Sequence, residues 1–146
     1  SAVSRLFKMG IEPFLIAYAI NLIVAQRLVR RLCPKCKKRV VNFDEGLMAA
    51  AELSIAEWRN FTIYEAAGCD ECNGTGYKGR LAIHEALYFT KELRQLIVRA
   101  GSDVDEESLK LQAKKDGSLT LREAGLEKVK MGLTSIEEVL AGTSES

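Results

Sequence analysis

The chain has 146 residues, a formal net charge of +1 and 47% hydrophobic residues, a composition typical of a folded soluble protein. This length excludes a large multidomain chain and allows one domain, or one domain with a small lobe. The charge is unevenly distributed, because residues 1–43 carry a net charge of +8 and residues 44–146 a net charge of −7. This division favours complementary contacts within the chain or between subunits as readily as an external polyanion.

The first 32 residues are predicted to be helical. We expect one helix over residues 1–9, stopped by Gly10, and a longer helix over residues 13–32. Proline is tolerated in the first turn of a helix, and Cys33-Pro34 would break the long helix at its end. Apolar residues nearly encircle the long helix, which predicts that it is central and buried.

An apolar run over residues 13–25 invites comparison with a membrane span. A span needs about 20 apolar residues. This run is shorter, is interrupted by Asn21 and ends at Gln26 and Arg27. We therefore expect no transmembrane segment, and the first five residues lack a signal-peptide cleavage pattern.

Two short helices are predicted over residues 44–59, and Ser54 with Glu57 forms the capping box of the second. A short strand is predicted at residues 61–64 and a longer one at residues 79–88. The stretch between the cysteine pairs described below is expected to have little apolar core of its own.

Four helices are predicted in the last third of the chain, because each has a capping residue at its start and a glycine at its end. They lie within residues 91–100, 103–115, 120–131 and 134–141. The predicted fold class is mainly α with a few short strands. We divide the chain into a helical part (1–32), a lobe containing the cysteines (33–79), and a strand followed by a helical subdomain (80–146).

Four cysteines form two CxxC pairs, Cys33 with Cys36 and Cys69 with Cys72, separated by 32 residues. Two such pairs are a strong signal for one tetrahedral metal site built from thiolates. We expect a structural Zn²⁺, with an iron–sulfur or redox site and four metal-free cysteines as the alternatives. A four-cysteine zinc site is closed, so it would stabilise a fold without catalysing a reaction. Two metal-type pairs without further cysteines favour a reducing cytoplasm.

Three other patterns are weaker. Residues 74–79 match GxGxxG, but a cysteine turn precedes them and a strand follows, whereas a dinucleotide site needs a strand and then a helix. His84, the only histidine, is expected on a strand without a catalytic role. Residues 69–76 read CxxCxGxG once, whereas the chaperone pattern repeats several times.

A basic run extends from Arg27 to Arg39 and includes Arg30 and Arg31. Beside a zinc site it could bind nucleic acid, and a zinc-ribbon nucleic-acid-binding module is the competing function class. No aromatic residue is interleaved in the run, so a stacking platform is missing. We expect the run to be a solvated or subunit-facing surface instead, and the clustering of Arg27, Arg30 and Arg31 suggests the hypothesis that these three face a protein partner.

Several segments together resemble the ATPases of type II secretion and type IV pilus assembly. The resemblance is carried, in order, by residues 1–6, by Met9-Gly-Ile-Glu-Pro-Phe-Leu-Ile, by Ala25-Gln-Arg-Leu-Val-Arg-Arg-Leu-Cys-Pro-Lys-Cys36, and by residues 68–85 and 116–140. The cysteine pairs match the zinc-binding insert of the assembly and secretion motors. Pilus-retraction motors resemble the rest but lack these cysteines.

The resemblance implies the C-terminal part of a RecA-like motor domain, lying past the Walker A, acidic, Walker B and histidine boxes. ATP and Mg²⁺ would then bind only in the parent motor, and this chain alone is expected to be inactive as an enzyme. It further implies a homo-hexamer, a cytoplasmic location at the bacterial inner membrane, and contacts with neighbouring subunits and the inner-membrane platform protein. Direct nucleic-acid binding is not expected. The motifs do not separate secretion from pilus assembly.

Overall fold

A computed structural model describes residues 2–144, and its backbone contacts divide the chain into two compact units. Unit 1 consists of Ser1–Ala25 and Glu85–Thr120, and unit 2 consists of Gln26–His84 and Leu121–Ser146. Both long strands of the protein have residues in each unit. The two units are described separately below.

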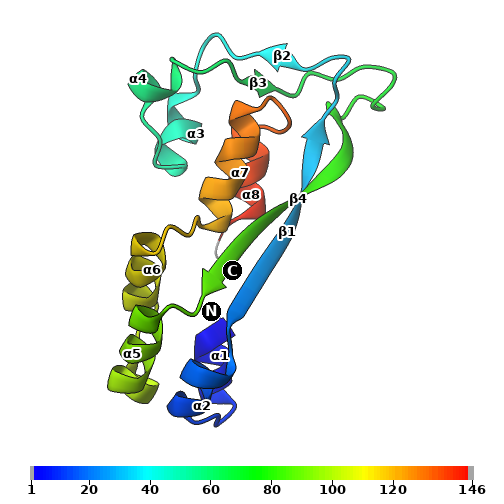
Figure 1. Cartoon of the computed structure of the whole chain (residues 1–146). Helices are drawn as coiled ribbons and strands as arrows, with labels where there is room; N and C mark the ends of the chain where they lie inside the picture. The colour runs from blue at the N-terminus through cyan, green and yellow to red at the C-terminus, as the bar shows by residue number, and fades with distance from the viewer. Residues whose placement is uncertain (1, 145–146) are drawn as a thin grey trace. The chain divides into compact units, whose positions relative to one another are not determined.

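The described residues form eight α-helices, one short 3₁₀ helix and four strands (Figure 1). This confirms the predicted class, mainly α with a few strands. In chain order the elements are α1 (Ala2–Lys8), α2 (Pro13–Ala19), β1 (Leu22–Leu32), β2 (Lys38–Arg39), α3 (Glu45–Ala50), α4 (Ile55–Trp58), β3 (Tyr64–Glu65), β4 (Tyr77–Tyr88), α5 (Lys91–Ala100), η1 (Gly101–Asp103), α6 (Glu106–Lys115), α7 (Leu121–Lys130) and α8 (Ile136–Gly142).

The predicted long helix over residues 13–32 is wrong after its first two turns. Helix α2 ends at Ala19, and residues 22–32 form β1, which pairs with β4 in a two-stranded sheet. The backbone carbonyl of Asn21 accepts a hydrogen bond from the amide of Phe89 at 3.0 Å, just before β1 begins. Ile23 and Val24 are β-branched and suit a strand, and pairing with a strand that begins 45 residues after β1 ends outweighs the local helical pattern.

Unit 1 has an apolar core between α1, α2, α5 and α6. Arg94 of α5 closes the end of α2, because its guanidinium donates to the carbonyls of Ala17 and Ile20, the latter at 2.9 Å. Those carbonyls have no partner within the helix itself. The buried side chains of this core are Val3, Ile16, Ala17, Phe89, Leu93, Ile97 and Leu109.

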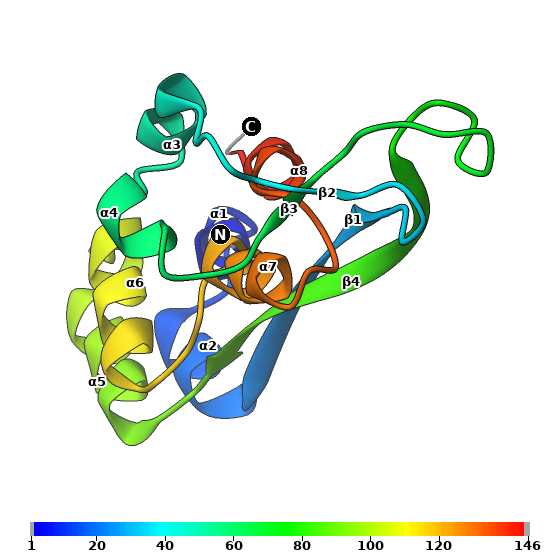
Figure 2. The same ribbon diagram turned by 90° about the horizontal axis from the view of Figure 1, so that it is seen from above.

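Unit 2 is built around α7 and α8, which lie side by side (Figure 2). The helices α3 and α4, both from between the cysteine pairs, pack against them through Met48 and Trp58. The expectation that this stretch carries little apolar core is therefore wrong. The buried members of the unit 2 core are Met48, Ala51, Trp58, Ile63, Val129, Ile136 and Val139.

Several helix starts are confirmed by their caps. The hydroxyl of Thr90 accepts from the amide of Leu93, and that of Ser54 accepts from the amide of Glu57. The last helix is capped by Ser135, one residue after the predicted start at Thr134. Side chains of this kind satisfy amides that have no partner in the first turn.

The strand predicted at residues 61–64 is displaced, since β3 covers only Tyr64 and Glu65. Within residues 2–144, no helix has both the length and the apolar content that a membrane crossing requires.

Candidate metal centre

The four cysteines meet at one point of unit 2, as their spacing predicted. Cys33 follows β1 directly, Cys36 lies in the turn after it, and Cys69 and Cys72 lie in a second turn that leads into β4. Their four sulfur atoms all lie within 4.8 Å of one another. Pairing of β2 with β3, Lys38 opposite Glu65, holds the two turns together.

The sulfur spacing fits a tetrahedral ion. The Sγ–Sγ distance is 3.8 Å from Cys33 to Cys69, 3.8 Å from Cys36 to Cys72, and 3.7 Å from Cys69 to Cys72. A zinc ion with Zn–S bonds of about 2.3 Å would separate its ligands by about 3.8 Å. None of the four cysteines forms a disulfide. The cluster can therefore hold one metal ion with all four thiolates.

Backbone amides point at two of the sulfurs. The amide of Gly68 donates to Sγ of Cys36 at 3.3 Å, and the amides of Cys69 and Gly76 donate to Sγ of Cys72 at 3.2 and 3.1 Å. Gly76 has a φ of +82°, and a Cβ there would lie 2.5 Å from Cβ of Ala66. A glycine is required at this position because any side chain would push the second cysteine turn away from Ala66.

These surroundings also separate the acidities of the thiols. Burial opposes ionisation of Cys72, but the amides of Cys69 and Gly76 outweigh it and lower the pKa of this thiol to about 6. For Cys36, the Gly68 amide favours the thiolate, whereas burial and the neighbouring sulfurs raise the pKa to about 11. A second negative sulfur beside an existing thiolate is unfavourable until a cation compensates it.

The three arginines singled out in the sequence have different surroundings on β1. All three are exposed, and Arg30 is in addition bound to Glu138 within unit 2. The guanidinium of Arg30 donates to both carboxylate oxygens of Glu138 at 3.0–3.2 Å, and its backbone amide donates to the same carboxylate at 2.7 Å. Arg30 also lies over the ring of Tyr77, 4.1 Å from its centroid.

Glu138 and Tyr77 are the partners that sequence reasoning missed. Burial opposes ionisation of Glu138, but the hydrogen bonds from Arg30 keep its pKa below the ordinary value of 4.5. The hydroxyl of Tyr77 lies 2.7 Å from that of Ser135, and burial of the ring raises the pKa of Tyr77. Arg30 and Glu138 are 108 residues apart, so no local pattern could have paired them.

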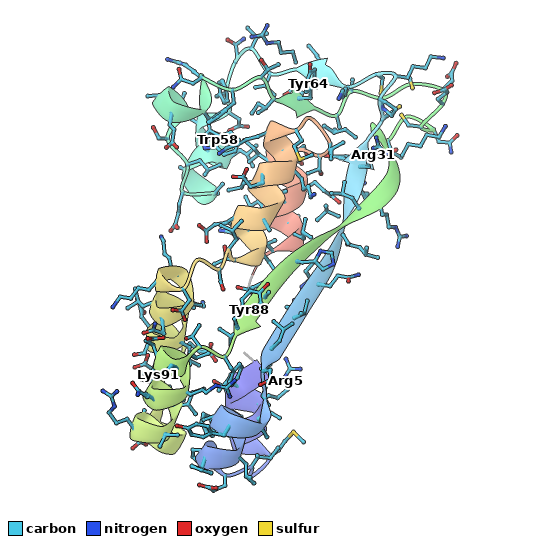
Figure 3. All side chains as sticks on the ribbon, viewed as in Figure 1. Arg5, Arg31, Trp58, Tyr64, Tyr88 and Lys91 are labelled. Carbon is cyan, nitrogen blue, oxygen red and sulfur yellow. The ribbon has the colours of Figure 1, made fainter. Side chains whose placement is uncertain are left out.

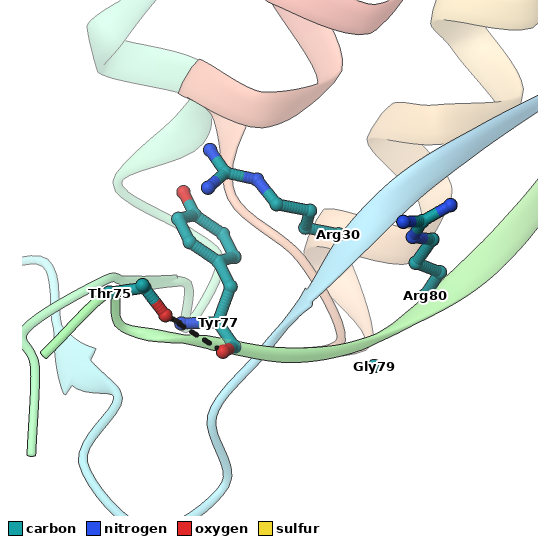
Figure 4. Close-up of a pocket in the computed structure, with 5 residues that line it drawn as sticks. All are labelled: Arg30, Thr75, Tyr77, Gly79 and Arg80. Carbon is teal, nitrogen blue, oxygen red and sulfur yellow. Dashed lines mark hydrogen bonds between the residues drawn. The ribbon is translucent and has the colours of Figure 1, made fainter. Parts of the chain in front are cut away.

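A shallow pocket of about 220 Å³ opens beside this network (Figure 4). It is lined by Arg30, Thr75, Tyr77, Gly79 and Arg80. The Thr75 hydroxyl is already committed, because it accepts from the amide of Tyr77 and can donate to either of two carbonyls, that of Cys72 at 2.8 Å or that of Tyr77 at 2.9 Å. The pocket lies at the surface between the second cysteine turn and the start of β4.

Two weak sequence patterns have ordinary surroundings. His84 is exposed on β4, with Nε2 3.2 Å from the side-chain oxygen of Gln26. The GxGxxG stretch runs from the second cysteine turn into β4, so a strand follows it and the dinucleotide geometry is missing.

The sequence matches one family over almost its whole length. The profile described as "Type II/IV secretion system protein" matches residues 1–141. The chain is 45% identical over 142 residues to a "Type IV pilus assembly ATPase PilB" of Myxococcus xanthus, covering 97% of this chain and 25% of that protein. It is 47% identical over 144 residues to a protein of the same name from Thermus thermophilus, covering 99% of the chain and 16% of the relative.

A secretion relative is also similar. The "Type II secretion system ATPase E" of Vibrio cholerae is 39% identical over 146 residues, covering 99% of this chain and 27% of that protein. The chain thus spans about a quarter or less of the length of these three relatives.

Proposed function

Since this chain belongs to the type II/IV secretion system protein family, we propose that it acts as the C-terminal, zinc-containing part of a hexameric ATPase. That motor would power the assembly of pilins or pseudopilins in type IV pilus biogenesis or type II secretion. The observation that carries the proposal is the match over nearly the whole chain to proteins named for these two machines.

ATP hydrolysis is assigned to sequence beyond these 146 residues. The printed sequence contains no GxxxxGK[ST] loop, the backbone cradle that holds nucleotide phosphates in such motors. We therefore expect no ATP turnover from this chain alone. ATP and Mg²⁺ would bind in the longer parent.

The four cysteines are proposed to hold a structural Zn²⁺. Sulfur distances near 3.8 Å and the amides directed at Cys36 and Cys72 support this assignment. A closed thiolate site supplies no open position for a substrate, so its role would be to fix the two turns. The predicted boundaries of the cysteine lobe, residues 33–79, are retained as part of this proposal.

The cysteine lobe is proposed to brace or dock the motor, against a neighbouring subunit or the inner-membrane platform protein. In this role the protein would act in the cytoplasm, peripheral to the inner membrane. The three arginines of β1 are all exposed, and because Arg30 is bound to Glu138, Arg27 and Arg31 suit contact with a partner best. Arg30 would act with them while remaining bound to Glu138.

The metal assignment is tested by elemental analysis of the purified chain. We expect one zinc per chain, and loss of stoichiometric zinc in Cys69→Ser. Ser54→Ala is the matched control, because it alters a helix cap in the same lobe without touching a sulfur. Absence of stoichiometric metal from the unmutated chain would refute the assignment.

The motor assignment is tested in a chimera. This chain replaces the 45%-identical region of the Myxococcus xanthus protein, and surface pili are counted. We expect pili with the unmutated chain and few or none with Cys69→Ser or with Arg27→Glu and Arg31→Glu combined. Lys91→Glu, an exposed charge reversal on α5, is the control. Normal pili in the arginine variant would exclude these residues as partner contacts.

A nucleic-acid role has its own test. Strong, salt-dependent retardation of DNA or RNA in a gel at physiological salt would favour the zinc-ribbon alternative.

A further inference from the structure

A second concavity in unit 2 lies away from the cysteines. It is a groove of about 150 Å³ between α3, the segment that carries β3, and the start of α8. Met48, Ile63 and Ile136, which line it, are all 5% exposed or less. Half-buried Phe43 and Leu47 also line it. The groove is thus an apolar slot that opens from the unit 2 core to the surface.

The lining of the groove carries three carboxylates, those of Asp44, Glu65 and Glu137. All three residues are exposed. One oxygen of Asp44 accepts from the amide of Leu47, and Lys38 stands opposite Glu65 across the β2–β3 pair. Within residues 2–144, no ion pair joins Glu65 or Glu137 to a cation. The residues that line the groove therefore carry negative charge, and Lys38 and Arg39 of β2 lie beside it on the paired strand.

The size of the groove limits what it can hold. Sites for small-molecule ligands typically enclose about 300–1,000 Å³, so this groove is too small for a cofactor. Its volume suits one long side chain. A lysine or arginine could lay its methylene stem along Phe43 and Leu47 and keep its charged end among the carboxylates.

We propose that this groove docks a partner protein by receiving a lysine or arginine side chain from an extended, basic and apolar segment. The carboxylates of the groove favour a basic segment by charge complementarity, and its apolar lining favours a side chain with a long methylene stem. Two nearby cations of this chain are occupied elsewhere: Lys37 donates to the carbonyl of Gly132 at 2.9 Å, and Nζ of Lys130 lies 3.5 Å from the carboxylate of Glu127. Since Lys38 stands opposite Glu65, an incoming cationic side chain would meet the carboxylates of Asp44 and Glu137.

Charge-assisted hydrogen bonds are roughly twice as strong as neutral ones. Loss of such a contact typically weakens binding about tenfold, which corresponds to about 1.4 kcal/mol. This inference rests on the docking role in the proposed function and adds the surface and the chemistry of its partner. It does not depend on the metal.

The test uses the full zinc-loaded chain and a fluorescent octapeptide with a central leucine–arginine pair flanked by glycine and serine. Fluorescence anisotropy measures binding, and a peptide with glutamate in place of arginine is the reference. We expect the arginine peptide to bind at least about tenfold more tightly than the glutamate peptide, a difference expected for one charge-assisted contact. Equal binding of the two peptides would overturn the proposal.

Variants then place the binding site. Glu137→Lys should weaken binding about tenfold or more, and Glu57→Lys should not. Both residues lie exposed in the first turn of a helix, so any cost to the helix terminus is matched. Asn42→Trp should cover the groove and abolish binding, whereas Asn60→Trp, at an exposed position outside it, should not.

The same loss in Glu57→Lys and Glu137→Lys would reject the groove as the site. Concentration-dependent self-association that Glu137→Lys abolishes, measured by sedimentation, would identify a second copy as the occupant and also overturn the proposal. Zinc content and pilus counts of the chimera report the proposed function separately. A failed peptide test with intact zinc and pili would refute the groove alone.

Discussion

The two ends of the cysteine lobe, residues 33–79, are built differently. At the apolar end, α3 and α4 place Met48 and Trp58 in a cluster with α7 and α8. At the cysteine end, two short turns supply four sulfur atoms. The turns, residues 33–37 and 68–76, contain no aromatic residue and no leucine, isoleucine, valine or methionine. In Figure 3, Trp58 lies on α4, Tyr64 lies on β3 and Arg31 lies on β1. One end is stabilised by burial of apolar surface, the other by backbone contacts to sulfur and the proposed metal.

The difference shows that a lobe defined by its cysteines need not fold as one piece. Burial of apolar surface is continuous and cooperative, whereas a metal site constrains only the segments that carry its ligands. The following four experiments separate the two ends, beginning with the largest expected effect.

Chelation of the metal should unfold the cysteine end and spare the apolar end. Structural zinc contributes about 10–16 kcal/mol of apparent binding free energy in small zinc domains. We expect amide exchange to accelerate at residues 33–37 and 68–76, while α3, α4, α7 and α8 keep their protection. Hydrogen exchange with mass spectrometry, with and without chelator, measures this. Equal loss of protection at both ends would contradict the separation.

Met48→Ala should destabilise the apolar end and leave the cysteine end intact. Met48 is 1% exposed, and truncation of a buried methionine to alanine typically lowers the free energy of unfolding by about 2–5 kcal/mol. Urea unfolding followed by circular dichroism gives this value. Val41→Ala, at a side chain that is 77% exposed, should cost less than about 0.5 kcal/mol. Zinc content should stay at one per chain in both variants.

Glu138→Gln should weaken the contact through which the end of β1 is bound to α8. We expect a loss of about 1–2 kcal/mol at neutral pH, reduced by the exposure of Arg30. The pKa of Glu138 is lowered by folding, so its stabilisation is present above the unfolded value of 4.5 and is lost as pH falls through the lower, folded value.

The difference in unfolding free energy between wild type and Glu138→Gln should therefore be constant above about pH 5 and shrink at more acid pH. Glu137→Gln is the control, because Glu137 is exposed and not bonded to Arg30. A pH-independent difference would show that the Arg30–Glu138 ion pair is not its source.

Lys35→Ala should have the smallest effect. Nζ of Lys35 lies 3.8 Å from the carboxylate of Glu71, joining the two cysteine turns across the surface. An exposed pair of this kind contributes about 0–1 kcal/mol and is screened by salt. We expect unchanged zinc content and a small rise in zinc dissociation rate. A large loss of zinc would mean that surface charge, and not sulfur, holds the turns.

Much of the fold followed from the sequence where the signals were local. Thr90 and Gly101 bracket α5 at its observed bounds, and the CxxC spacing brought the four sulfurs together. A cap or a cysteine turn is specified by residues within a few positions of one another, so single-sequence reasoning can find it.

The wrong predictions depended on contacts between residues that lie far apart in the sequence. Residues 22–32 became a strand because β4 supplies their partner, and Glu138 reaches Arg30 across 108 residues. The apolar end of the cysteine lobe was missed because α3 and α4 bury their side chains against α7 and α8, which begin 63 or more residues after α4 ends. Such contacts leave no periodic signal in either segment.

Trp58 is the only tryptophan of the chain and lies 4% exposed in the apolar end. Its ring is 5.5 Å from that of Phe61, and the Lys130 ammonium is 5.4 Å from it. Intrinsic tryptophan emission therefore reports on one end of the cysteine lobe and is blind to the other. If a chelator removes the metal while the tryptophan emission stays constant, the apolar end has kept its structure without the metal.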